Sequence, residues 1–380
     1  MQEMKLNRAK KGVLQNLLDR FCKSNVMSST KKIVKAEKKV RAAVVGMGIG
    51  RPNGRAIARN SRGQVVALCD IVEERMKDFA KELPEKVKFY TDYKEMCKDP
   101  DIDAVFVGTP NQLHVPIALE AVRNGKHVMV TKPLADSESA AAKLVEEAED
   151  AGVVNMMSLS TRFSATCRYL GDLAQQGYFG ELYYARARSI RRSGIPAWNL
   201  GFIQKGGGAF RDMGVHALDA VWWILGMPKP VSVFGVAGAK FGPRGLGYWD
   251  FSKPKKEIYE QYAADDYAGG FIRFENGIGL QVESFWASHQ PGEFQIELFG
   301  TEAGAQMSPL KLYRTEHGAP QDISVNLPRG PEAWDNIAGH FIECILDGKE
   351  CTAPLRHGLI VQQMMEALLK SAETGKEVRL

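Results

Sequence analysis

The sequence predicts an α/β protein whose N-terminal half is a doubly wound parallel sheet and whose C-terminal half is an α+β domain with a mainly antiparallel sheet. In the first half, runs of β-forming residues alternate with helical segments, as in a parallel sheet with crossover helices. In the second half, strands follow one another with few helices between them, and residues 275–277 (Glu-Asn-Gly) form a hairpin signal. A length of 380 residues fits two domains.

The charge of the chain is concentrated at its N-terminus. Residues 1–41 contain twelve Lys or Arg and three acidic residues, a net charge of +9 against +5 for the whole chain, so the remainder carries −4. The folded body therefore shows no basic excess that would indicate nucleic-acid binding. We expect residues 1–38 to be a disordered basic leader. The alternatives are an amphipathic organelle presequence and an upstream misread start with initiation at Met27.

The apolar runs and the cysteines favour a cytoplasmic protein that binds no membrane. No run approaches the roughly 18 consecutive apolar residues of a membrane span, and the leader lacks the apolar core of a secretory signal. The six cysteines form no CxxC pair and adjoin no histidine cluster. We therefore expect neither a disulfide framework nor a metal site.

The first strand and the turn after it predict a dinucleotide site. Residues 40–45 form a short β run that enters a glycine turn at 46–50, and 51–58 continue as a helix. Glycines let the backbone approach a pyrophosphate, whose charge meets the free N–H groups of the helix N-terminus. The third glycine of the usual G-x-G-x-x-G pattern falls on Arg51, so we expect Gly50 or Gly54 to replace it. The turn residues assigned to the cofactor are Gly46, Gly48, Ile49 and Gly50.

The second strand favours NAD as the cofactor. Residues 65–69 end in Asp70, which follows Gly46 by 24 residues, close to the spacing of the acid that binds the adenosine ribose. A carboxylate accepts hydrogen bonds from ribose hydroxyls and repels a 2′-phosphate. NADP is the alternative, through the nearby arginines Arg51, Arg55 and Arg75.

The third strand–helix–strand unit predicts a ligand crevice. Residues 103–108 and 127–131 are strands, and 115–124 is the helix between them. Ligands of such sheets lie beyond the carboxyl ends of the strands. The crevice residues are Thr109, Pro110, Asn111, His114, Thr131, Lys132 and Pro133. For His114, a helix-start residue that touches no ligand is an equal alternative.

The stretch from Gly206 to Asp219 predicts a proton-handling helix face. The glycines at 206–208 place the helix start near 209–212. Asp212 and His216 are four residues apart and Asp219 follows three residues later, so we expect them on one face. An imidazole takes and returns a proton near neutrality, and a carboxylate can orient its ring. The alternative is a helix whose histidine only satisfies a core hydrogen bond.

The remaining elements of the second half follow from the same patterns. Strands are predicted at 153–158, 182–190, 231–237, 267–274, 279–286 and 294–300, a long loop at 242–256, and amphipathic helices at 333–346 and 360–372. One sheet face would pack on helices. The other face would be free to pair with a second subunit, so we expect a homodimer or homotetramer.

Together these residues resemble the glucose-fructose oxidoreductase, inositol dehydrogenase and rhizopine catabolism (Gfo/Idh/MocA) family. The resemblance covers about residues 40–375 and depends on Val45–Gly48, Asp70, Gly108–Asn111, His114, Lys132–Ala135, Arg162–Phe163 and Gly206–Gly226. It implies an N-terminal Rossmann domain, a C-terminal domain with a large open sheet, and a nicotinamide held between them. The family's catalytic Lys, Asp and His fall on Lys132, Asp212 and His216, whereas the Glu of its Glu-Lys-Pro motif is Thr131 here. The expected domains are 1–38 (leader), 39–152 (Rossmann), 153–355 (substrate binding and oligomerisation) and 356–380 (a helix packing back on the body).

The expected function is hydride transfer between a nicotinamide cofactor and a ring hydroxyl of a sugar, glycoside or inositol-type cyclic polyol. In this hypothesis Asp212 orients His216, and either His216 or Lys132 is the immediate base, with the lysine stabilising the alkoxide. Trp198 is assigned as an aromatic platform for the sugar, and the substrate-binding set is Arg162, Trp198, Asp212 and His216. The alternatives are an NAD-dependent glycosidase that works by transient oxidation and elimination, and a sugar-sensing regulator without turnover.

Overall fold

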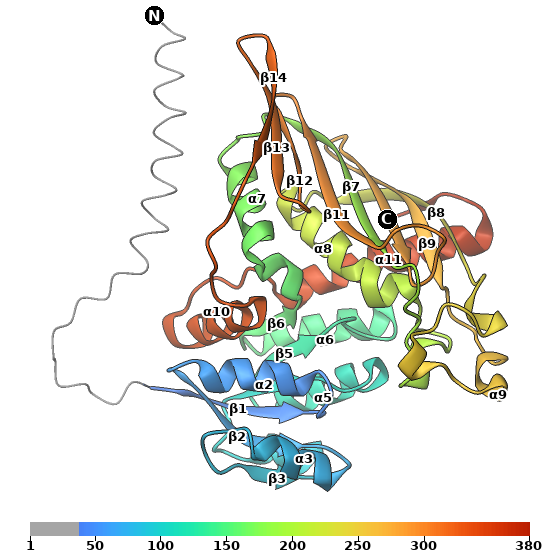
Figure 1. Cartoon of the computed structure of the whole chain (residues 1–380). Helices are drawn as coiled ribbons and strands as arrows, with labels where there is room; N and C mark the ends of the chain where they lie inside the picture. Colours follow the sequence, from blue (N-terminus) through green and yellow to red (C-terminus); the bar gives the residue numbers. More distant parts are fainter. Residues whose placement is uncertain (1–37) are drawn as a thin grey trace, which may run out of the picture. The chain divides into compact units, whose positions relative to one another are not determined.

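The computed structural model describes residues 38–380, so the leader predicted at residues 1–38 lies outside the described residues except for Lys38. Residues 39–380 form one unit, which contains a six-stranded and a nine-stranded sheet (Figure 1). The two sheets confirm the predicted fold class. None of the described helices has the length and apolarity needed to cross a bilayer.

The first sheet is parallel throughout, in the order β3-β2-β1-β4-β5-β6. Its strands are β1 Val40–Val45, β2 Gly63–Cys69, β3 Lys88–Tyr90, β4 Ala104–Val107, β5 His127–Thr131 and β6 Asn155–Ser158. Its helices are α2 Gly50–Arg59, α3 Glu73–Ala80, α4 Tyr93–Lys98, α5 His114–Arg123 and α6 Glu138–Asp150, with a 3₁₀ turn η1 at Asn111–Leu113. The central strand β4 is buried at every position, because helices cover both faces of the sheet.

One strand belongs to a different sheet from the one the sequence predicts. The run at 153–158 was assigned to the second domain, but β6 pairs in parallel with β5, Val128 opposite Asn155 and Thr131 opposite Ser158. The first sheet therefore extends to Ser158, beyond the predicted boundary at 152. The sequence of a short apolar run does not indicate which of two sheets the strand will join.

The second sheet has the order β14-β13-β12-β11-β7-β10-β9-β8-β15, and within it only the pair β7–β10 is parallel. Its strands are β7 Leu182–Ile190, β8 Pro230–Gly238, β9 Tyr267–Phe274, β10 Gly279–Phe285, β11 Glu293–Gly300, β12 Ala303–Gln306, β13 Lys311–Glu316, β14 Ala319–Ser324 and β15 Val378–Arg379. The hairpin predicted at 275–277 joins β9 and β10, with Gly277 at φ +86°. The last four strands were not predicted, because they are short or carry no apolar alternation.

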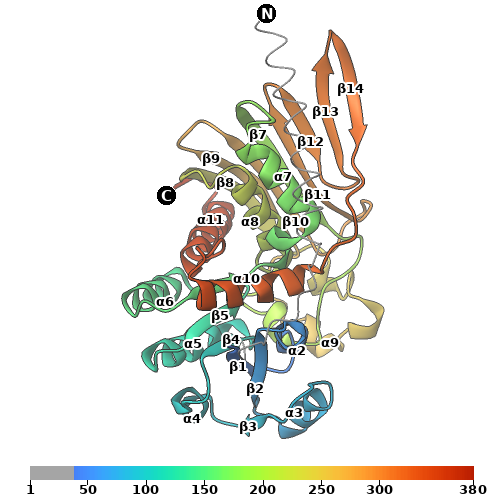
Figure 2. The same cartoon turned by 90° about the vertical axis from the view of Figure 1, so that its left-hand side faces the viewer.

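Helices cover one face of this sheet (Figure 2). They are α7 Ala165–Gln175, α8 Val215–Ile224 and α11 Leu355–Thr374. On the other face, Phe234, Val236 and Phe271 are exposed. The remaining turns and helices are η2 Ser160–Phe163, η3 Leu200–Phe202, η4 Phe210–Gly214, η5 Gly242–Arg244, η6 Asp250–Ser252, α9 Lys256–Tyr259 and α10 Ala333–Asp347.

Helix α10 returns from the second part of the chain to the core of the first. Ile337, Phe341 and Ile342 lie in one buried cluster with Val40 and Ile57 of β1 and α2. Burying such side chains stabilises the fold by about 1.5–3 kcal/mol each. The two parts therefore share a core, which fixes the position of one relative to the other.

The glycine turn after β1 has a steric requirement for its first residue. Gly46 has φ +85°, and a Cβ built on it would lie 2.5 Å from the carbonyl oxygen of Gly108. Gly50 and Gly54 bring α2 close to β1, because their Cβ atoms would meet Val44 Cγ1 at 2.8 Å and Cγ2 at 3.3 Å. Both glycines therefore do the packing expected of the third glycine in the predicted motif.

Replacing Gly46 by Ala should destabilise the fold more than backbone strain alone explains. The left-handed conformation costs an alanine about 1–2 kcal/mol, and the contact with the Gly108 carbonyl adds to it, for a loss of about 3 kcal/mol in the free energy of unfolding. Gly125→Ala is the matched control, since Gly125 has φ +69° but no atom within 4 Å of the added Cβ. Urea denaturation of both variants tests this, and equal losses would show that the close approach is unimportant.

Candidate active site

A cavity of about 660 Å³ lies between the two sheets. We call it the central cavity, and the lining residues that bear on the chemistry are Ile49, Thr131, Lys132, Arg191, Asp212 and His216. Three of these come from the end of β1 and β5, and three from the second part of the chain. A smaller cavity of about 260 Å³, beside β8 and β15, contains none of the predicted site residues.

Lys132 and Asp212, which are 80 residues apart in sequence, form an ion pair in this cavity. The Nζ of Lys132 donates to Asp212 Oδ1 at 2.7 Å and to the Asp212 carbonyl at 2.7 Å. The lysine directly follows β5, where the carboxyl end of a parallel strand points its next residues into the crevice. Two of the three ammonium hydrogens are thus used, and one is left for a ligand.

Trp286 holds the other oxygen of the Asp212 carboxylate. Its Nε1 donates to Asp212 Oδ2 at 2.9 Å. Burial raises the pKa of Asp212, but the charge of Lys132 and the donors Lys132 and Trp286 outweigh it, so the net pKa lies below its ordinary value. Sequence reasoning missed Trp286, which was placed only at the end of a predicted strand. A tryptophan in an apolar run gives no signal that its N–H has a partner.

Asp212 and His216 line the same cavity, but the predicted hydrogen bond by which Asp212 would orient the imidazole is absent from the described residues. Both carboxylate oxygens are bonded to Lys132 and Trp286, and Asp219 lies on another face, in an ion pair with Arg162. The reason is that residues 210–214 form a π-helical turn, in which the Val215 N–H reaches back to the Phe210 carbonyl. Such a turn is wider than an α-helical one, so residues four apart no longer stack. The helix itself was correctly predicted and continues as α8.

His216 is an uncharged imidazole on the wall of the central cavity. Burial and the charge of Lys132 lower its pKa, and the Asp212 carboxylate opposes this only in part. Its Nδ1 is buried and has no hydrogen-bond partner among the described residues. An unsatisfied buried polar atom costs about 1–3 kcal/mol. The ring is therefore uncharged near neutral pH and has a nitrogen that is free, among the described residues, to accept a hydrogen bond from a bound ligand. The lowered pKa makes it a weaker base than an ordinary histidine.

Two predicted site residues have structural contacts instead. Arg162 is 2% exposed and does not line the cavity; its Nε donates to Asp219 Oδ2 at 3.0 Å and its guanidinium also donates to the Thr352 carbonyl. The prediction that Arg162 contacts the substrate is therefore wrong, because the guanidinium donors are used in the buried ion pair with Asp219 and in the bond to Thr352. His114 is buried with Nδ1 2.8 Å from the Pro133 carbonyl oxygen and Nε2 2.7 Å from that of Thr109. It holds two crevice turns together, as in the alternative reading, and leaves no ring nitrogen for a cofactor.

The glycine turn fits a dinucleotide. A Cβ on Gly48 would meet nothing within 4 Å, so this side of the turn is open to a ligand. Asp70 is 8% exposed; its Oδ2 accepts from the Met47 N–H at 2.8 Å and its Oδ1 from the Val72 N–H at 2.9 Å. The carboxylate therefore braces the turn and keeps lone pairs for a further donor. At the end of β4, the buried Oγ1 of Thr109 has no partner among the described residues.

Other predicted residues of this region occupy the same edge of the first sheet. Pro110 caps η1, and the Nδ2 of Asn111 donates to the Gly206 carbonyl at 3.4 Å, which ties the crevice to the glycines before the π-helical turn. Thr131 is buried and lines the central cavity. Trp198 does not line the cavity and is 57% exposed.

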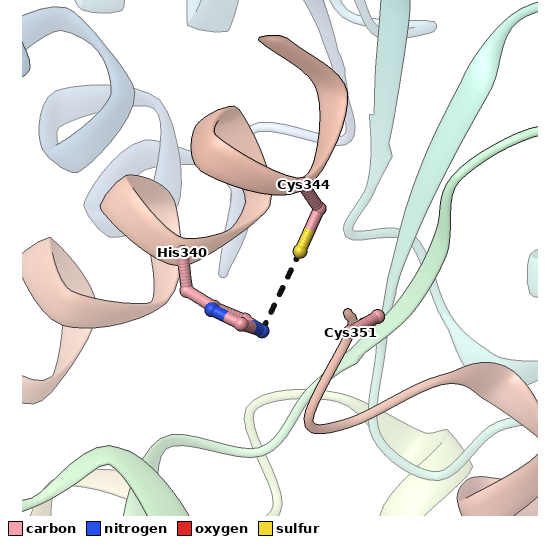
Figure 3. A group of neighbouring side chains, drawn as sticks. All are labelled: His340, Cys344 and Cys351. Carbon is pink, nitrogen blue, oxygen red and sulfur yellow. Dashed lines mark hydrogen bonds between the residues drawn. The ribbon is translucent and has the colours of Figure 1, made fainter. Parts of the chain in front are cut away.

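His340, Cys344 and Cys351 lie together at the end of α10 (Figure 3), an arrangement that sequence analysis overlooked. Their potential ligand atoms lie within 4.8 Å of one another. However, the Nε2 of His340 already accepts a hydrogen bond from the Thr352 N–H at 2.9 Å. A metal ion at this nitrogen would displace that bond, and the contact with Cys351, together with burial, raises the pKa of Cys344 and disfavours its thiolate. We assign no ion to this cluster.

Comparisons with known proteins bear on the family and the fold of this chain. Residues 40–159 match the model of an oxidoreductase family with an NAD-binding Rossmann fold, and residues 167–306 match the GFO/IDH/MocA C-terminal domain. The chain is 30% identical to the D-glucoside 3-dehydrogenase of Escherichia coli over 90% of this chain and 97% of that protein. It is 28% identical to the NAD(+)-dependent scyllo-inositol 2-dehydrogenase of Bacillus subtilis over 82% and 88%. A levoglucosan dehydrogenase, solved with NADH and levoglucosan, shares the fold with a TM-score of 0.78 at 20% identity, over 90% of this chain and 99% of that one.

Replacing Trp286 by Phe should weaken the fold in a pH-dependent way. The folded-state pKa of Asp212 is depressed, so its contribution to stability is complete above its unfolded pKa of about 4 and is lost as the pH falls through the lower folded value. Loss of a hydrogen bond to a charged group should cost about 1.5–3 kcal/mol at pH 7. The cost should shrink below about pH 4, as the carboxylate becomes protonated.

Trp222→Phe is the control, because the Nε1 of this buried tryptophan donates at the same 2.9 Å to an uncharged carbonyl, that of Pro228. The Trp222→Phe variant should lose about 1 kcal/mol of unfolding free energy, and this loss should not depend on pH. Urea denaturation of both variants from pH 7 to pH 3 makes the comparison. If the loss of unfolding free energy had the same pH dependence in both variants, Trp286 would not stabilise the ionised carboxylate.

Proposed function

Since this chain belongs to the Gfo/Idh/MocA oxidoreductase family, we propose that it transfers a hydride between NAD and a ring hydroxyl of a sugar, glycoside or inositol-type cyclic polyol. The observation that carries the proposal is the meeting of Lys132, Asp212 and His216 in one cavity between the two sheets. The relatives named for glucosides and inositols support the substrate class.

The proposed roles follow from the charge state of each side chain. His216 is uncharged and accepts the proton of the substrate hydroxyl. Lys132 donates its remaining N–H to the same oxygen, so that negative charge developing there is stabilised. Asp212 positions Lys132 through two hydrogen bonds, and it acts on the imidazole only through its charge. NAD, when bound, supplies the hydride acceptor for the hydrogen on the same carbon.

The residues of the first sheet would hold the cofactor. Gly48 leaves the turn open to the cofactor, and Gly46 and Gly50 allow the close packing that shapes the turn. Asp70 favours the free ribose of NAD over the 2′-phosphate of NADP. Thr131 takes the place of the glutamate in the family motif, so Asp212 supplies the carboxylate that pairs with Lys132.

We also propose that two or four copies of the chain associate through the open face of the second sheet. Phe234, Val236 and Phe271 are exposed on neighbouring strands β8 and β9 of that face. Large apolar side chains gathered on a sheet face are typical of a surface that a second subunit covers.

A panel of hexoses, glycosides and inositols, assayed with NAD, tests the function. We expect at least one member to be oxidised with stoichiometric NADH. His216→Ala should lower turnover by about 10²-fold or more, because the base is lost, while NAD affinity stays unchanged. Absorbance of NADH gives turnover, and calorimetry gives the dissociation constant for NAD.

His289→Ala is the control for this variant, since His289 is exposed and packs against Phe241 outside the central cavity. It should retain the turnover of the unmodified chain. Unchanged turnover of His216→Ala would remove His216 from the mechanism. Release of an aglycone without net NADH would instead identify the glycosidase reaction.

Asp70→Asn should shift cofactor preference toward NADP. The amide oxygen can still accept from the Met47 N–H, but the charge that repels a 2′-phosphate is gone. We expect the ratio of kcat/KM for NADP to that for NAD to rise by roughly tenfold or more. Glu73→Gln removes a charge from the first turn of the following helix and should leave the ratio unchanged. An unchanged ratio in Asp70→Asn would show that Asp70 only braces the turn.

A further inference from the structure

Three aromatic rings stack at the protein surface beside the central cavity. The ring planes of Trp198 and Trp249 lie within 8° of parallel with centroids 5.1 Å apart, and Phe251 lies 5.4 Å from Trp249 and 6.0 Å from Trp198 at 17° and 18°. We call this cluster the aromatic stack. Trp198 is 57% exposed and Phe251 is 79% exposed. Rings held parallel and left open to solvent form a flat apolar surface of the kind that marks a binding site.

The stack is held in place by its own loops. The Gly194 and Ile195 N–H groups both donate to the Gly247 carbonyl at 2.8 Å, which ties the loop of Trp198 to the loop of Trp249. Ile195 and Tyr248 continue this pairing as a β-bridge and are buried. A surface that is fixed before a ligand arrives loses little conformational entropy on binding.

The stack is continuous with the catalytic residues by two routes. Arg191 lines the central cavity, and its guanidinium carbon lies 4.7 Å from the centroid of the Trp249 ring. On the other route, Phe202 contacts the Trp198 ring at 5.6 Å and the Trp286 ring at 6.4 Å. The indole of Trp286 donates to the Asp212 carboxylate. Arg191 therefore borders both the central cavity and the aromatic stack, so a ligand that fills the cavity and extends past Arg191 would meet the rings.

Three of the polar side chains in these loops are bonded to the backbone, which helps to fix the loops. Ser193 Oγ donates to the Tyr248 carbonyl, Asn199 Oδ1 accepts from the Gly201 N–H, and Ser252 Oγ donates to the Trp249 carbonyl. A second sugar ring would need several hydrogen-bonding partners at this position, whereas the stacked rings present an apolar surface. A planar apolar group would need no such partners.

We propose that the aromatic stack binds the planar, apolar aglycone of a glycoside whose sugar ring occupies the central cavity. This inference rests on the function proposed above and narrows its substrate class to glycosides, as against free polyols. The aglycone would lie on the rings of Trp198 and Phe251, outside the reacting centre. Stacking of this kind is worth a factor of roughly 2 to 12 in affinity for each ring pair.

The test compares methyl and phenyl β-D-glucopyranoside, which share the sugar and differ only in the aglycone. We expect the phenyl glycoside to have the higher kcat/KM, through a lower KM, by roughly tenfold. Phe251→Ala should reduce this preference by at least about threefold. Since Phe251 is largely exposed, its loss should not disturb folding. The control is Tyr183→Ala, an exposed aromatic at the other end of β7 from the cavity, which should keep the full preference.

Binding measured without turnover separates this inference from the proposed function. Titration of tryptophan fluorescence with each glycoside, in the presence of NADH, gives dissociation constants whether or not oxidation occurs. If neither glycoside is oxidised but phenyl glucoside binds more tightly and Phe251→Ala removes the difference, the stack is supported and the reaction is not. If the unmodified chain and Phe251→Ala prefer phenyl glucoside over methyl glucoside to the same extent, the inference is overturned. A fall in oligomeric mass of Phe251→Ala also overturns it, because the stack would then be a contact between copies of the chain.

Discussion

The ion pair between Lys132 and Asp212 is the interaction on which the site depends. It joins the end of β5 in the first sheet to the turn before α8 in the second part, and both side chains are mostly buried, at 19% and 16% exposure. A buried pair is favourable only when its remaining donors and acceptors are satisfied. Here the Asp212 carbonyl and the Trp286 indole supply those partners. Removing either charge would leave the other uncompensated between the two parts.

The π-helical turn makes this pairing possible. At its start, the Phe210 N–H donates to Asp265 Oδ2 at 3.0 Å and the Ala209 carbonyl accepts from Ser284 Oγ at 2.8 Å, so the segment before β9 and strand β10 hold the turn from outside. A regular α-helix would place Asp212 above His216 and direct the carboxylate to the imidazole. The wider turn releases the carboxylate to the lysine instead. The histidine then stays neutral beside a cation, and its Nδ1, which has no partner among the described residues, can accept a hydrogen bond from a hydroxyl group.

The parts of this arrangement that the sequence could predict are those carried by local pattern. Strand ends, the glycine turn and the helix that carries Asp212 and His216 follow from periodicity and motif spacing, whereas the catalytic assignment of Lys132 depends on the family resemblance. The contacts of His114, Arg162 and Asp219 do not, because spacing along a helix gives a face but not what that face meets. Arg162 and Asp219 lie 57 residues apart and satisfy each other in the core, which no window of sequence shows. The same limit explains why Trp286 and the pairing of β6 were missed.

Packing couples the surface loops to the catalytic turn. One buried cluster contains Ile195, Met213, Tyr248 and Trp286. The partly buried side chain of Phe202 packs against it. The loops that carry the aromatic stack and the turn that carries Asp212 therefore share a core. Protein cores are close-packed and transmit strain from one side to the other. Trp286 belongs to both, with its ring near Phe202 and its N–H on the carboxylate. A rearrangement of these loops would therefore disturb the core that holds Trp286, so the proposed binding outside the cavity and the proposed reaction inside it share one packed support.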